Sequence, residues 1–116
     1  MPKNQLFVLA LVIILLTGYL TLAINSNVPK SLSKTEIETA VNQAKFLYKL
    51  NKETNEDLSL GPCLSNDLLP NWVVDIVHSP RTAIDDLPEN QCPSIIEGRA
   101  KHFVELDLEG NLIRAL

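Results

Sequence analysis

The chain has 116 residues and a formal net charge of −4, and 46% of its residues are hydrophobic. This length leaves room for one modest folded domain and excludes a second. Its basic residues alternate with acidic ones instead of forming the basic stripe that nucleic-acid binding requires, so we expect no nucleic-acid partner.

The segment from Leu6 to Ile24 contains no charged residue. As a helix it would be about 28 Å long, close to the ~30 Å thickness of a bilayer's hydrocarbon core. We therefore predict a membrane anchor over residues 1–24, an uncleaved signal that contacts lipid through residues 6–24. The alternative is a cleaved signal peptide, with Lys3 in its basic start, which would make the protein secreted.

The positive charges on the two sides of the anchor nearly balance, so charge alone does not set its orientation. A short amino-terminal tail is more easily kept inside than a whole domain. We therefore expect a single-pass protein of the cell membrane with its carboxy-terminal domain outside the cytoplasm.

Residues 25–32 read as a polar tether, in which Pro29 prevents a continuous helix from leaving the membrane. A domain is expected over residues 33–116. Ser33 and Glu36 have the spacing of a capping box, and an amphipathic pattern follows that predicts a helix ending near Lys52.

Short strands are expected after this helix. Leu58–Leu60 is a candidate strand, and Leu64–Asn71 is expected to be a turn because Pro70 disfavours helix before it. Trp72–His78 is the clearest central strand, with alternate side chains on opposite faces. Ser79–Pro93 has no periodicity and is expected to be a long ordered loop.

The carboxy-terminal segment predicts a β-hairpin. Lys101–Glu109 alternates between two faces, Gly110 and Asn111 suit a tight turn, and Leu112–Leu116 returns as the partner strand. The expected fold class is α+β: a transmembrane helix, one amphipathic helix, and an antiparallel sheet of three or four strands ending in this hairpin.

Cys63 and Cys92 are the only cysteines. In a small domain outside the cytoplasm such a pair favours a disulfide, which would stabilise the fold by roughly 3–4 kcal/mol through loop closure. The alternatives are a metal site formed by both cysteines with a histidine, or a thiol nucleophile at Cys92 helped by His102. Neither has a supporting motif, so we predict no metal, no cofactor and no enzyme activity.

The loop that precedes Cys92 is the candidate binding segment, because ordered loops on a rigid sheet concentrate recognition residues. Its polar residues are His78, Arg81, Asp85, Asp86, Glu89 and Asn90. A calcium site is an alternative that lacks the EF-hand spacing. A purely structural alternative is that Asp85 and Asp86 cap turns and that Arg81 pairs with one of them. His78 and His102 could meet across the sheet.

The general plan, an apolar amino-terminal helix followed by a helix and a small antiparallel sheet, resembles that of pilin-type subunits. The chain lacks their Gly-Phe processing site and the glutamate near the start of the apolar segment, and Pro29 interrupts the helix that they run continuously. We therefore expect a membrane-anchored binding domain whose partner is another protein. The resemblance implies a pilus-like or secretion-assembly subunit as the alternative.

Overall fold

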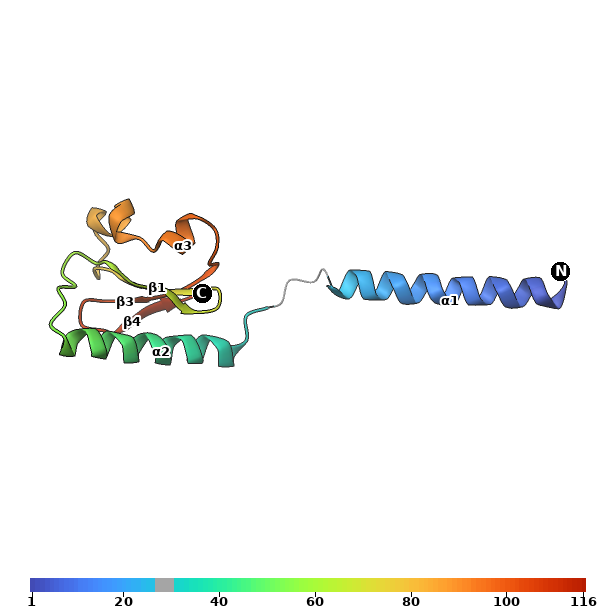
Figure 1. Cartoon of the computed structure of the whole chain (residues 1–116), viewed down its shortest axis with the longest axis horizontal. Coiled ribbons are helices and arrows are strands. Elements are labelled where there is room, and N and C mark those ends of the chain that lie inside the picture. Colours follow the sequence, from blue (N-terminus) through green and yellow to red (C-terminus); the bar gives the residue numbers. More distant parts are fainter. Residues whose placement is uncertain (27–30) are drawn as a thin grey trace. The chain divides into compact units, whose positions relative to one another are not determined.

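The computed structural model describes residues 1–26 and 31–116, which form two compact units, Met1–Ser31 and Leu32–Leu116 (Figure 1). Much of the expected tether, with Pro29, falls on residues 27–30 and so lies outside the described residues. The elements of the second unit are α2 (Lys34–Glu53), β1 (Cys63–Leu69), β2 (Trp72–Ile76), the 3-10 helices η1 (Ala83–Asp86) and η2 (Pro88–Asn90), α3 (Pro93–Ile96), β3 (His102–Leu106) and β4 (Leu112–Ala115).

Helix α2 begins where the sequence predicts. The Ser33 hydroxyl accepts a hydrogen bond from the backbone N–H of Glu36 at 3.1 Å, which satisfies one of the free donors of the first turn. The Glu36 carboxylate turns toward the sheet and accepts from the indole nitrogen of Trp72 at 3.3 Å. The cap residues therefore also join the start of the helix to the central strand.

The α+β class is confirmed, with four strands in the order β1-β2-β3-β4. The pairs β1–β2 and β3–β4 are antiparallel, and β3–β4 is the predicted terminal hairpin. The expectation of a wholly antiparallel sheet is wrong for β2 and β3, which pair in parallel from Trp72 beside His102 to Ile76 beside Leu106. Parallel neighbours need a long crossover connection, and residues 77–101 supply it.

The first strand lies later than predicted. Leu58–Leu60 forms no strand, and the expected turn at Leu64–Asn71 is wrong, because most of that segment belongs to β1. Asn66 and Asp67 gave it a turn-like composition, because such residues are depleted in strands. Most of β1 is only partly buried, as suits an edge strand, and the chain reverses after it at Asn71, whose φ is 70°.

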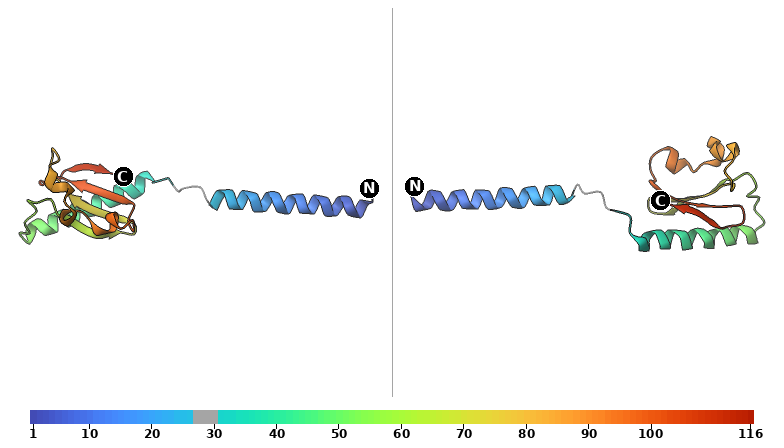
Figure 2. Two further views of the ribbon diagram at one scale, coloured as in Figure 1. Left: turned by 90° about the horizontal axis from the view of Figure 1, so that it is seen from above. Right: turned by 180° about the vertical axis from the view of Figure 1, so that it is seen from behind.

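Helix α2 covers one face of the sheet (Figures 1 and 2). Ala40 and Ala44 are fully buried on its inner side, where their small side chains allow the helix to lie close to the strands. The sheet residues in this core are Trp72, Val74, Ile76, Val104 and Leu106. The predicted alternation of the central strand is therefore confirmed for the face toward the helix.

The other face of the sheet lies beneath residues 77–101, which we call the loop layer (Figure 1). Val73, Cys92 and Ala100 are buried in a second, smaller core on this side. The predicted disulfide joins Cys63 at the start of β1 to Cys92 in the loop layer, with the two Cα atoms 4.9 Å apart. The disulfide therefore ties the loop layer covalently to the edge strand of the sheet.

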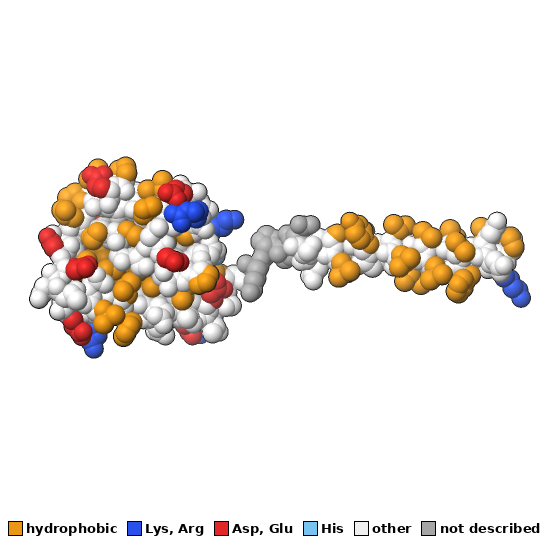
Figure 3. Space-filling model, viewed as in Figure 1, with side chains coloured by type: hydrophobic (Ala, Val, Ile, Leu, Met, Phe, Trp, Pro, Cys, Tyr) orange, Lys and Arg blue, Asp and Glu red, His pale blue; other side chains and the backbone are white. Residues whose placement is uncertain are grey.

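Helix α1 (Lys3–Ser26) has no buried side chain, and apolar side chains cover most of the face seen in Figure 3. The hydroxyls of Thr17 and Thr21 donate to backbone carbonyls one turn earlier, at 2.9 Å to Ile13 and 2.7 Å to Thr17. These bonds satisfy polar groups that hydrocarbon could not. The helix is long and apolar enough to cross a membrane.

Candidate functional site: a cleft beneath the loop layer

The first turns of the loop layer are organised around Asp85, whose side chain is fully buried. Its carboxylate accepts from the backbone N–H of His78 at 3.0 Å and from that of Thr82 at 2.8 Å, and it lies 2.8 Å from His78 Nδ1. Gly61 allows this close packing, because a Cβ at that position would lie 2.6 Å from Asp85 Oδ1. Asp85 therefore holds the first turns of the loop layer together, packed against Gly61.

The two partners in this contact shift each other's titration. Burial alone would raise the pKa of Asp85, but the hydrogen bonds from the Thr82 backbone and from His78 outweigh it and leave the pKa below its ordinary value. The hydrogen bond to Asp85 raises the pKa of His78. The pair is therefore a structural ion pair when His78 is protonated.

Arg81 joins the loop layer to strand β3. Its guanidinium contacts Asp86 Oδ1 at 2.9 Å and Glu105 Oε1 at 3.1 Å. Arg114 on β4 contacts the same Glu105 at 2.6 Å and also lies over the ring of Phe103, 4.9 Å from its centroid. A buried glutamate is thus held by two arginines from different elements.

Asp75 on β2 stands next to this network in the sheet. The strand register places Cys63, Asp75, Glu105 and Arg114 in one row across the four strands. Asp75 Oδ1 is buried without a hydrogen-bond partner, and no other side-chain nitrogen or oxygen is so placed among residues 1–26 and 31–116. Burial, and then the neighbouring charge of Glu105, raise the pKa of Asp75 to about 8.

These residues line a cleft with a volume of about 180 Å³. Its polar lining residues are Asp75, Arg81, Gln91, Glu105 and Arg114, and its other lining residues are Val73, Cys92, Ile95 and Phe103. A concave, partly apolar site with a few convergent polar groups and a strongly shifted carboxyl is typical of a binding site. We call it the Asp75 cleft.

The structure divides the predicted loop residues between two roles. Arg81 lines the Asp75 cleft and Asp86 pairs with it, whereas the Asn90 side chain is turned inward and donates to the Ile84 carbonyl at 2.9 Å. Glu89 is exposed. The pairing of Arg81 with Asp86 and the capping by Asp85 are the arrangement that the structural alternative described.

The two histidines do not meet. His102 begins β3 beside Trp72, with ring centroids 5.0 Å apart, whereas His78 follows the far end of β2. They would have been neighbours only if β2 and β3 were antiparallel. Both cysteine sulfurs are in the disulfide, so Cys92 is not a free thiol. The described residues contain no group of three or more His, Cys, Asp or Glu side chains able to hold a metal ion.

Sequence reasoning missed Asp75, Glu105 and Arg114 as site residues. Asp75 interrupts the otherwise apolar run from Val73 to Val77, and an acid on the inner face of a central strand is a signal that could have marked it. Its proximity to Glu105 could not be found in the same way, because it depends on the parallel register of β2 and β3.

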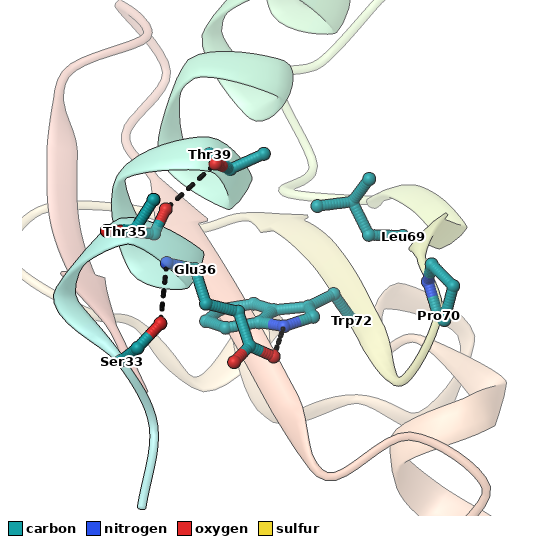
Figure 4. A pocket seen from close by; sticks show the side chains of 7 residues that line it. All are labelled: Ser33, Thr35, Glu36, Thr39, Leu69, Pro70 and Trp72. Carbon is teal, nitrogen blue, oxygen red and sulfur yellow. Dashed lines mark hydrogen bonds between the residues drawn. The ribbon is translucent and has the colours of Figure 1, made fainter.

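A second hollow of about 440 Å³ lies where the start of α2 meets the turn between β1 and β2 (Figure 4). Three of its polar side chains are already engaged: Ser33 caps the helix, Glu36 holds the Trp72 indole, and the Thr39 hydroxyl donates to the Thr35 carbonyl at 2.8 Å. It therefore offers mainly shape and apolar surface.

Comparison of the chain with protein-family models, with curated proteins and with solved structures gives no match.

Proposed function

We propose that this chain is a single-pass membrane protein whose disulfide-bonded domain lies outside the cytoplasm and binds another protein through the loop layer. Helix α1 supports the anchor, since it has the length and composition of a membrane span and buries none of its side chains within the described residues. The closed disulfide supports the compartment, because such bonds persist where the environment is oxidising.

The observation that carries the binding function is the surface of the loop layer. Three large apolar side chains on it remain exposed: Ile84 by 40%, Leu87 by 42% and Ile96 by 56%. They belong to short helical turns held in place by the buried Asp85 and by the disulfide. Apolar side chains that a rigid support keeps in water are typical of protein-binding surfaces.

The charged groups of the domain fit a protein partner better than a nucleic acid. Arg81, Arg99 and Arg114 are each held by a carboxylate of the domain itself. Acidic and basic side chains are scattered over the face seen in Figure 3 and form no basic patch there. A phosphate backbone would require several free basic groups in a row.

The orientation is tested by intact mass of protein purified from membranes with alkylation and without a reductant. The full-length mass less two hydrogens, with no alkyl group added, is the expected result. Alkylation of both cysteines would refute the oxidising compartment. The mass of a chain that lacks residues 1–24 would refute the single-pass anchor and favour a secreted protein.

The binding surface is tested by placing a photo-crosslinking residue at Leu87 in the full chain in its native membrane. The matched control carries the same residue at Lys49, which is exposed on α2 on the opposite side of the sheet. We expect a discrete adduct from position 87 and none from position 49. The loop layer is excluded as the binding surface if both positions react alike or neither reacts. An adduct of twice the chain mass would show that the loop layer binds a second copy of this chain, as the alternative of a pilus-like or secretion-assembly subunit requires.

A further inference from the structure

We propose that the Asp75 cleft binds a carboxylate group, with Asp75 donating a hydrogen bond from its floor and Arg81 and Arg114 donating from its rim. The inference rests on the proposed function in one respect, since an acidic side chain of the bound protein is one source of this group. A free short-chain carboxylate is the other source, and the chemistry of recognition is the same.

The floor of the cleft has an unused hydrogen-bonding group. Asp75 Oδ1 has no partner, although Asp75 lies between the disulfide-bonded Cys63 and Glu105 in the row across the sheet. Because the pKa of Asp75 is raised to about 8, this side chain is largely neutral at pH 7 and carries a proton that it can donate. An unsatisfied buried polar group is costly, and a ligand that accepts from it recovers part of that cost.

The rim offers further donors. A guanidinium has five N–H groups. Arg114 uses two in its bonds to Glu105, and Arg81 uses three in its bonds to Glu105 and Asp86. Both arginines line the cleft and are partly exposed, so donors remain for a ligand. With a protonated Asp75 the free polar groups of the cleft are then mainly donors, which suits an acceptor ligand.

The charged groups around Asp75 are paired with one another, so the free hydrogen-bond donors of the cleft, and not its net charge, would select the ligand. Glu105 on β3 and Asp85 in η1 face Asp75 and oppose its ionisation, while Arg81 from the loop layer favours it. Arg114 on β4 is bound to Glu105, and Asp86 to Arg81, so the two guanidiniums are matched by two carboxylates. A cation in the cleft would lie next to both guanidiniums, which repel it.

The volume of the cleft limits the size of the ligand, and the apolar lining favours an aliphatic chain on it. Val73, Ile95 and Phe103 line the cleft beside its polar groups. A volume of about 180 Å³ holds a carboxylate with a short aliphatic chain. Acetate, propionate and the side chains of aspartate and glutamate fall in this class.

The first experiment titrates the full chain, in phosphatidylcholine nanodiscs, with sodium acetate and with methylammonium chloride at matched ionic strength. The readout is the NMR shift of the Arg114 Nε–H group. We expect saturable shifts with acetate in the millimolar range and none with methylammonium. Above about pH 8 the acetate affinity should fall about tenfold per pH unit, as Asp75 loses the proton that it donates.

Two variants separate the donor from the fold. Asp75→Asn keeps an N–H donor without a titratable proton, so acetate affinity should no longer depend on pH in this range. Asp75→Leu removes the donor and should abolish saturable binding while the domain still folds, as shown by the chemical shifts of α2. Arg114→Gln should weaken acetate binding at least severalfold, whereas Arg99→Gln, a paired arginine outside the cleft, should leave it unchanged.

A second titration distinguishes the two sources, using the capped peptides acetyl-Ala-Glu-Ala-amide and acetyl-Ala-Gln-Ala-amide. If the glutamate peptide binds and the glutamine peptide does not, the ligand is an acidic side chain of a protein partner. If acetate binds and neither peptide does, the ligand is a free small carboxylate. No saturable shift with acetate up to about 50 mM, or an affinity that rises with pH, would overturn the carboxylate site. Because the crosslinking at Leu87 uses no carboxylate, the proposed function can survive that result.

Discussion

Replacing Asp75 by asparagine should stabilise the domain at neutral pH, because the native carboxyl must take up a proton when the chain folds. The pKa of Asp75 is raised to about 8 in the folded chain and is about 3.9 in an unfolded one. Between these values the folded state binds the extra proton, so the free energy of unfolding falls by about 1.4 kcal/mol per pH unit. The loss at pH 7 is about 4 kcal/mol, which solvent screening reduces to about 2–4 kcal/mol. Asparagine avoids this loss.

The assay is urea unfolding of the full chain in detergent micelles, followed by the fluorescence of Trp72. This residue is the single tryptophan and is 1% exposed, so its signal reports the core of the domain. The gain in stability of Asp75→Asn over wild type should be near zero at about pH 4, grow up to about pH 8 and then level off. Asp67→Asn, at an exposed acid on β1, is the matched control. A gain that stays constant between these pH values would refute the reasoning.

Three further predictions concern the supports of the loop layer and of the hairpin. Removing the disulfide with Cys63→Ser and Cys92→Ser should cost about 3–4 kcal/mol in urea unfolding, since the bond closes a loop of 29 residues; an unchanged midpoint would contradict this. Gly110→Ala should cost more than about 1 kcal/mol in the same assay, because φ is 85° and a Cβ would clash with a tyrosine ring of α2; wild-type stability would exclude the clash. His78 should titrate in NMR above its ordinary pKa, and in Asp85→Asn its pKa should return toward the ordinary value. Because the folded-state pKa is the higher one, the contribution of His78 to stability is complete below about pH 6.5 and is lost as the pH rises through the folded-state pKa.

The elements that sequence reasoning found are those whose signals are local. The cap at Ser33 and the three-and-four spacing after it lie within α2, and the hairpin turn is set by Gly110, whose φ is positive. The alternation of the central strand correctly predicts that Asp75 points away from Trp72 and Ile76. Within one element, the spacing of residues determines which side chains share a face.

The parts that could not be predicted depend on pairing between distant segments. Strand β1 has a turn-like composition and becomes a strand because it pairs with β2 at the sheet edge. The neighbours of Asp75 follow from the register of β3, which begins only after the twenty-five residues of the loop layer. No local pattern specifies this register, so the sequence does not predict the cleft although it assigns most of the cleft residues to strands or to the loop.

The length of the loop layer is itself a topological signal. An antiparallel neighbour can be reached by a two-residue turn, whereas a parallel neighbour requires a crossover of a dozen or more residues that returns the chain to the same end of the sheet. Residues 77–101 make this return across the face that α2 leaves free. The same connection therefore makes β2 and β3 parallel, covers Asp75, and brings Arg81 to Glu105. A shortened loop layer that keeps Cys92 should therefore separate Arg81 from Glu105, expose Asp75 to water and move Cys92 away from Cys63. The packing of α2 on the other face of the sheet should remain largely intact.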